Sequence, residues 1–195
     1  MGYDVALFPK TRNSKIIIKI IDCEEQYKIK ELSRTFSMFQ SRNFEGCELK
    51  QVEKILQIDL SAYWSQPINF QPNLYDLEYQ LLKFEEKEDN EGIDLIKKAI
   101  ENERLNWKQN YDNINEGWVE LQKFKSTTSD FLQRIKGKPN FGSEIKVLKD
   151  WDYHWYDYFF SGCKNNIEED LISILKKLEC YEENNIKFVA LIGGY

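Results

Sequence analysis

The stretch WDYHWYDYFF, residues 151–160, is the element around which we expect the rest of the chain to be organised. Seven of its ten residues are aromatic, and it contains two of the five tryptophans and the only histidine. Aromatic side chains bury large areas in cores and also anchor interfaces, so such a run suits either a hydrophobic core or the wall of a binding surface. The stretch by itself does not decide between the two.

The segments on either side of this stretch favour the core. Residues 145–148 read as a short strand leading into it, and Asn165 or Asn166 suits the N-cap of the helix that follows. Both elements need a core to pack against, so we expect most of the rings to be buried. Tyr156 and Tyr158, on the second face of the stretch, are the predicted contacts for a partner.

Strands are predicted at both ends of the chain. Residues 3–8 read as a first strand, which Pro9 ends. Residues 15–21 are β-branched and apolar on both faces, which is typical of a central strand. Residues 187–192 form a last apolar run and are predicted to be a buried strand.

Helices are predicted between the terminal strands. The segment after residue 21 fits either a hairpin partner or a helix over about 30–40, and one-sided apolar spacing favours the helix. Asn73 is a candidate N-cap for a helix that ends in the acidic run near residue 85, and Asn90-Glu91-Gly92 is the expected break. The remaining predicted helices cover residues 48–58, 93–107, 118–135 (with a possible interruption at 126–129) and 167–178.

This order of elements predicts an α+β fold in one domain, residues 1–195. The N- and C-terminal strands would form a small sheet, and an acidic helical middle section would pack against it. Residues 71–136 are a possible helical subdomain.

Composition indicates a soluble bacterial or phage protein. Lys, Asn, Ile, Glu and Tyr are abundant, as in AT-rich genomes, and the longest apolar runs are too short to span a membrane. Residues 1–6 lack an export pattern, so we expect a cytoplasmic location. In that compartment the four scattered cysteines, Cys23, Cys47, Cys163 and Cys180, are expected to be thiols. Their spacing predicts no metal site, and no cofactor-binding motif is present.

The net charge of −6 is concentrated in one part of the chain. Residues 71–120 carry 13 acidic and 6 basic side chains, whereas the segments before and after are close to balanced. Concentrated negative charge disfavours nucleic acid and attracts basic proteins, although residues 123–149 form a local basic strip. We therefore predict a basic protein partner. The predicted partner-binding residues are Glu85, Glu86, Glu88, Asp89, Glu91, Tyr156 and Tyr158.

An alternative site lies within the aromatic stretch itself. His154 is the natural general base, Asp152 or Asp157 would orient it, and Trp155 would supply a platform for a carbohydrate. No nucleophile or metal motif accompanies these residues, and a histidine packed among aromatics serves structure equally well. An enzyme or carbohydrate-binding protein is thus the second hypothesis, and a phage or structural assembly component is a third.

Two resemblances accompany this interpretation. The opening Met1-Gly2-Tyr3-Asp4-Val5 resembles the start of small uncharacterised bacterial and phage proteins, which imply no site residues. In size, acidity and absence of catalytic motifs, the chain is also similar to immunity proteins of bacterial toxin systems. Together with the charge pattern, this similarity favours a non-enzymatic protein-binding module, such as an immunity protein or antitoxin-like inhibitor. The sequence leaves catalytic activity and oligomeric state open.

Overall fold

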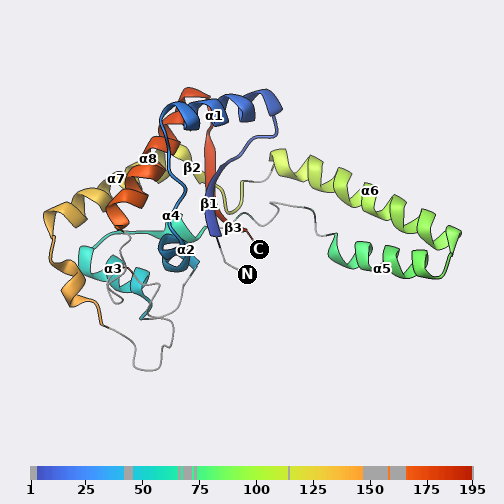
Figure 1. The fold of residues 1–195 in the computed structure, drawn as a ribbon, viewed down its shortest axis with the longest axis horizontal. Coiled ribbons are helices and arrows are strands. Elements are labelled where there is room, and N and C mark those ends of the chain that lie inside the picture. The colour runs from blue at the N-terminus through green and yellow to red at the C-terminus, as the bar shows by residue number, and fades with distance from the viewer. Residues whose placement is uncertain are drawn as a thin grey trace. The chain divides into compact units, whose positions relative to one another are not determined.

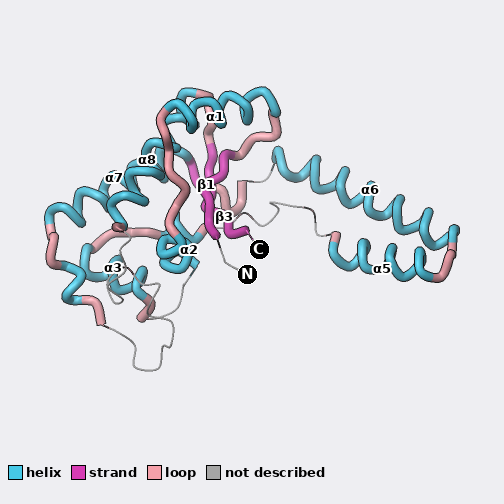
Figure 2. Tube along the Cα trace, viewed as in Figure 1, coloured by secondary structure: helices cyan, strands magenta, loops and turns pink. Residues whose placement is uncertain are grey.

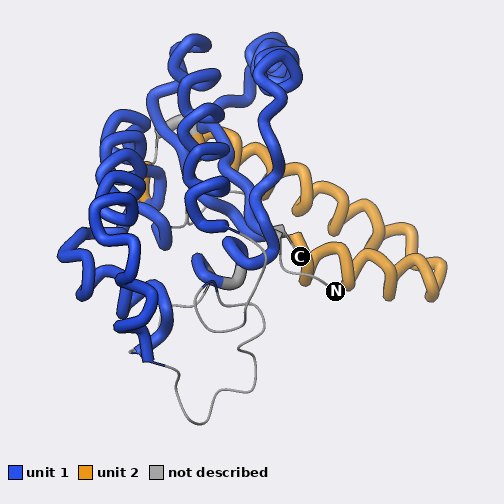
Figure 3. Tube along the Cα trace, turned by 60° about the vertical axis from the view of Figure 1, so that its left-hand side comes forward, with its two compact units in different colours: residues 1–66, 117–195 blue, residues 67–116 orange. Residues whose placement is uncertain are grey.

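The computed structural model describes residues 4–41, 46–65, 67, 72, 74–113, 115–146, 158 and 166–194. The chain divides into two compact units (Figure 3). Unit 1 comprises residues 1–66 and 117–195, and unit 2 comprises residues 67–116. The helix predicted over residues 118–135 belongs to unit 1.

Three strands of unit 1 form an antiparallel sheet in the order β1-β3-β2 (Figures 1 and 2). Strand β1, Asp4–Pro9, pairs along its length with β3, Phe188–Gly194, so that Ala6 lies opposite Ile192. Strand β2, Val119–Glu120, pairs with the other side of β3. The two terminal strands are therefore neighbours in one small sheet, and the predicted α+β fold is confirmed.

The outer edge of β1 is closed by side chains from two helices. Ser37 Oγ accepts a hydrogen bond from the Val5 backbone N–H at 2.9 Å, and Tyr181 Oη donates to the Leu7 carbonyl at 2.6 Å. An edge strand usually offers unpaired backbone groups to another chain. Here two of those groups are already bonded, which makes addition of a partner strand to β1 unfavourable.

Residues 15–21 are helical, and the predicted central strand is wrong. They belong to α1, Ser14–Gln26, whose N-cap Asn13 accepts a hydrogen bond from the Lys15 N–H at 3.0 Å. Ile20 and Cys23 are buried and Ile16 packs against the core, a spacing that places all three on one helical face. Tertiary packing along that face outweighs the strand preference of the isoleucine run.

The other helices of unit 1 largely follow the predicted pattern (Figure 1). The well-marked C-terminal helix is present, and Asn166 is its N-cap, accepting from the Glu168 N–H at 2.9 Å. The bounds are α2 Arg34–Ser41, α3 Glu48–Leu56, α4 Ser61–Trp64, α7 Leu121–Gly137, the 3-10 helix η1 Phe141–Glu144, and α8 Ile167–Glu183.

Two details of the prediction around α7 are wrong. Val119 and Glu120 extend the sheet instead of starting the helix, because Val119 pairs with Val189. The helix also continues through residues 126–129, where the Thr128 hydroxyl donates to the Phe124 carbonyl at 2.9 Å. That bond satisfies a buried hydroxyl without breaking the helix. The predicted strand at 145–148 is absent at Ile145 and Lys146, and residues 147 and 148 lie outside the described part.

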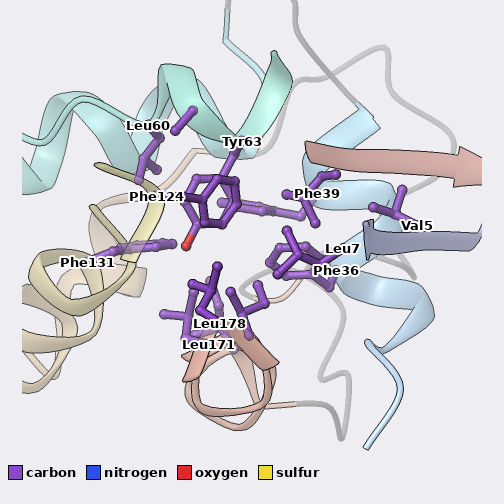
Figure 4. Close-up of a cluster of buried hydrophobic side chains, with 14 of the residues drawn as sticks. Val5, Leu7, Phe36, Phe39, Leu60, Tyr63, Phe124, Phe131, Leu171 and Leu178 are labelled. Atoms are coloured by element: carbon purple, nitrogen blue, oxygen red, sulfur yellow. The ribbon is translucent and has the colours of Figure 1, made fainter. Parts of the chain in front are cut away.

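The hydrophobic core centres on aromatic side chains from α2, α4 and α7 (Figure 4). Tyr63 is fully buried, with its ring centroid 5.2 Å from that of Phe124 and 6.1 Å from that of Phe131. Phe36 and Phe39 complete the group from α2, and Phe39 stacks on Phe131. The Tyr63 hydroxyl donates to Thr128 at 2.9 Å, so this buried polar group is satisfied.

A disulfide between Cys23 and Cys180 joins α1 to α8. The prediction of thiols is therefore wrong for this pair. The two Cα atoms lie 5.9 Å apart, which suits a disulfide. Lys177 and Glu24 form an ion pair at 3.2 Å between the same two helices. Cys47 is buried in the core, and Cys163 lies outside the described residues.

Unit 2 is a helical hairpin. Helix α5, Tyr75–Glu86, and helix α6, Asn90–Asn113, lie side by side and are joined by a turn of three residues (Figures 1 and 3). Leu77, Leu81 and Phe84 form the half-buried inner face of α5, and Ile96 and Ile100 are buried on α6. The candidate N-cap Asn73 lies outside the described residues.

Candidate functional site

The turn of the hairpin is held by backbone hydrogen bonds that end α5. The Asp89 N–H donates to the Phe84 carbonyl at 3.0 Å, and the Glu88 N–H donates to the Glu85 carbonyl at 3.1 Å. The backbone angle φ of Glu88 is 55°, in the left-handed region. This arrangement is a Schellman motif, in which glycine is the usual left-handed residue. Glutamate here fixes the same turn and adds a negative charge to it.

Helix α6 begins directly after this turn, so the break predicted at Asn90-Glu91-Gly92 is wrong. Asp89 Oδ1 accepts a hydrogen bond from the Gly92 N–H at 3.0 Å, which makes Asp89 the N-cap of α6. Gly92 lies in the first turn of this helix. A Cβ at this position would come within 2.3 Å of the Phe84 ring, so glycine is the residue that fits. The glycine serves close packing between the two helices.

Five exposed carboxylates surround this turn, and we call them the acidic tip. They are the predicted residues Glu85, Glu86, Glu88, Asp89 and Glu91, and the turn brings all of them together. The six ion pairs that join described side chains all lie in unit 1. No basic side chain in the described part of unit 2 therefore neutralises the acidic tip in an ion pair.

The negative charge of the molecule resides in the hairpin. Unit 2, residues 67–116, contains 12 acidic and 6 basic side chains, and unit 1 contains 21 of each. The net charge of the hairpin, −6, thus equals that of the whole chain. A concentrated field of one sign raises the local concentration of oppositely charged partners and speeds their encounter.

Helix α5 also carries an exposed apolar stripe, which sequence reasoning missed. Tyr75, Tyr79 and Leu82 are 77%, 53% and 58% exposed, and we call them the outer stripe. Their spacing of four and three residues places them on one side of α5, opposite the inner face that contains Phe84. The same spacing is visible in the sequence, next to the more apolar stripe of the inner face.

The aromatic stretch 151–160 lies outside the described residues except for Tyr158. This applies to the predicted contact Tyr156 and to the alternative site Asp152, His154, Trp155 and Asp157. Tyr158 itself is only 9% exposed, and its ring packs edge-on against Phe39 with centroids 5.7 Å apart. The prediction of Tyr158 as a surface contact is therefore wrong, because its side chain completes the core.

A buried polar cluster holds Tyr158 in place. Asp170, in the first turn of α8, accepts hydrogen bonds from the Tyr158 hydroxyl, from Ser33 Oγ at 2.6 Å and from the Ser33 N–H at 2.7 Å. Glu48 accepts from the Tyr158 backbone N–H at 3.2 Å. Burial, followed by the negative charge of Asp170, raises the pKa of Tyr158 well above its ordinary value.

This cluster serves structure better than chemistry. Ser33 also accepts from the Phe36 N–H at 3.0 Å and thereby caps α2, so its hydroxyl is engaged on both sides. A hollow of about 200 Å³ adjoins the cluster, and Lys30 at its rim pairs with Glu169. A nucleophilic serine needs a base that can take its proton, commonly a histidine. Among the described residues around Ser33, the Asp170 carboxylate is already bonded to three donors and Lys30 is paired with Glu169.

Replacement of Asp170 by alanine is expected to lower the free energy of unfolding by about 3 kcal/mol. The change would remove the carboxylate that accepts from the part-buried Ser33 N–H and hydroxyl and from the buried Tyr158 hydroxyl. Glu169→Ala is the matched control, because that carboxylate is exposed and its pair with Lys30 spans 3.8 Å. The control should cost less than about 1 kcal/mol. Denaturant unfolding measures both, and equal losses would contradict the structural role of the cluster.

A hollow of about 480 Å³ in unit 1 is lined by residues of β1, α1, the loop before α2, and α8. Its charged walls include Glu24 and Lys177, which pair with each other at 3.2 Å. The two facing charges are therefore matched within the protein. No group of three or more potential metal ligands occurs among the described residues, and no described helix is long and apolar enough to cross a membrane.

Comparison with known proteins adds no relative to this picture. No family model, curated protein or solved structure matches the chain.

Proposed function

We propose that this protein is a non-enzymatic binding module that holds a basic partner protein through its acidic hairpin. The observation that carries the proposal is the location of the charge: unit 2 has a net charge of −6 and unit 1 is balanced. Charges that serve only solubility need not be gathered in one quarter of a chain. In character this corresponds to an immunity protein or antitoxin-like inhibitor that covers a basic surface of its target.

The geometry of the turn supports this role. The Schellman bonds, the Asp89 cap and the contact of Gly92 with Phe84 fix the backbone that presents the carboxylates. A binding surface that is ordered before the encounter loses less conformational entropy on association. Exposed carboxylates contribute mainly by steering the partner, and they act over about 8 Å at physiological salt.

Neutralising the acidic tip is expected to reduce capture of the partner strongly, because the charges that steer it are removed. The tip variant carries Glu85→Gln, Glu86→Gln, Glu88→Gln, Asp89→Asn and Glu91→Gln. Asparagine retains an oxygen that can accept from the Gly92 N–H, so the helix cap persists while the charge is lost. Tagged wild-type and variant proteins are expressed in the native cell, and the proteins that co-purify are quantified. Once the partner has been purified, its association rate with the tip variant should be lower than with the wild type by about tenfold or more.

A second variant with the same change in net charge separates local from overall effects. It neutralises five exposed carboxylates of unit 1 through Asp22→Asn, Glu25→Gln, Glu31→Gln, Glu120→Gln and Glu179→Gln. This control should retain the partner, and wild-type association should slow as salt rises. The proposal is wrong if wild-type protein retains no basic protein, or if both variants lose the partner equally.

A further inference from the structure

The outer stripe of α5 has no counterpart among the packed faces of the hairpin. The side of α5 that points away from α6 carries Tyr75, Tyr79 and Leu82. The opposite side of α5 contacts α6 through Leu81 and Phe84. The Lys83 ammonium lies 4.4 Å from the centroid of the Tyr79 ring and covers part of it. The rest of the stripe is open to solvent over nearly two turns of helix.

A helix that is apolar on two opposite sides has the pattern of the middle member of a three-helix layer. One apolar side suffices for packing in a two-helix hairpin, and the other side of a surface helix is ordinarily polar. Apolar residues spaced by four and three positions are also how a helix receives another helix. Tyrosine is a frequent anchor of protein interfaces, because it combines a large apolar ring with a polar end.

Charge around the stripe selects its occupant. Helix α5 carries four acidic residues, Asp76, Glu78, Glu85 and Glu86, against one basic residue, Lys83. Glu86 lies in line with the stripe one turn beyond Leu82, and Glu78 flanks it. A second copy of this chain would bring the same acidic helix to the interface, and like charges across an interface are unfavourable. A helix with lysine or arginine beside its apolar face is complementary.

We propose that the outer stripe is a docking surface for a basic amphipathic helix of the partner protein, which would lie along α5 as the third helix of the layer. Apolar side chains of that helix would cover Tyr75, Tyr79 and Leu82, and its basic side chains would pair with Glu78 and Glu86. This inference rests on the proposed function and names its recognition element. The acidic tip steers the partner, and the outer stripe holds it.

Two synthetic peptides of about 18 residues, or five helical turns, test the inference with the whole protein. Both contain the same numbers of leucine and lysine. In the first, leucines follow the i, i+3, i+4, i+7 pattern of one helical face, and in the second they are distributed around the helix. Fluorescence anisotropy should show at least about tenfold tighter binding of the first peptide. Tyr79→Ser combined with Leu82→Ser should remove that preference, while the melting temperature stays near that of the wild type.

Leu95→Ser combined with Leu105→Ser is the matched control. These leucines of α6 are 68% and 50% exposed but do not belong to the stripe, so the preference should persist in this variant. Equal affinity for the two peptides, no binding of either, or equal loss in both variants would overturn the inference. A dimer in light scattering that the Tyr79→Ser, Leu82→Ser variant abolishes would assign the stripe to a second copy and also overturn it. Capture of the native partner by the wild type, but not by the tip variant, would leave the proposed function standing in each case.

Discussion

Reduction of the Cys23–Cys180 disulfide is expected to lower the free energy of unfolding by about 5 kcal/mol. The bond joins residues that are 157 positions apart, so it closes most of the chain into one loop. In the chain-entropy view, a cross-link stabilises by restricting the unfolded state, and the effect grows with the logarithm of loop length. For a loop of this size the expected contribution lies at the upper end of what a single disulfide supplies.

Denaturant unfolding with and without a thiol reductant measures this contribution. In the double variant Cys23→Ala, Cys180→Ala, the reductant should have no effect, because the bond that it acts on is gone. Cys47→Ala should retain the full response, since Cys47 lies in the core apart from the pair. A wild-type stability that does not change with reductant would show that the pair exists as thiols. Disulfides are rare in a reducing cytosol, so a titration against redox potential also bears on the predicted cytoplasmic location.

The two terminal strands and several helices were predictable because their signals are local. The apolar runs of β1 and β3 and the Asn166 cap of α8 each stand out from their neighbours in sequence. The strand prediction for residues 15–21 is wrong because an isoleucine run fits both the strand and the helix period. It is apolar enough for a buried strand, yet Ile16, Ile20 and Cys23 also share a helical face. Only the partner that receives that face, α8, distinguishes the two readings.

The candidate site was predictable in its charge but not in its shape. The clustering of Glu85 to Glu91 follows from adjacency in the sequence, so any compact turn would gather it. Exposure of Tyr75 and Tyr79 depends on which of two apolar faces of α5 meets α6, and the close approach of Phe84 to Gly92 settles that. A helix end formed by left-handed Glu88 has no sequence signal comparable to a glycine.

The described aromatic core comes from residues that are far apart in the sequence. Phe36, Tyr63, Phe124 and Phe131 meet from three helices, and of the stretch 151–160 only Tyr158 is described among them. Density of aromatic residues in one segment does not show where rings converge, because convergence depends on long-range topology. Widely separated single aromatics on apolar helical faces make up this part of the core.

Stability is expected to fall steeply above about pH 10, the ordinary pKa of tyrosine. Burial raises the pKa of Tyr63, Tyr158 and Tyr181 in the folded protein, and nearby carboxylates raise those of Tyr158 and Tyr181 further. Above that pH the unfolded chain loses these protons while the folded protein retains them. The stabilising contribution is therefore fully present below the unfolded pKa and declines as the pH rises toward the folded values.

Each proton that the folded protein retains lowers the free energy of unfolding by about 1.4 kcal/mol per pH unit above the unfolded pKa. Three buried tyrosines together therefore lower it by about 4 kcal/mol per pH unit. Denaturant unfolding at a series of pH values from about 9 to 11 measures the slope. Tyr63→Phe and Tyr181→Phe should each flatten it by about 1.4 kcal/mol per unit, because each removes one retained proton. Phe131→Leu provides the control, since it weakens the same core without removing a phenol and should lower stability equally at every pH. A slope that the two tyrosine variants leave unchanged would show that these hydroxyls ionise alike in the folded and unfolded chain, which their burial opposes.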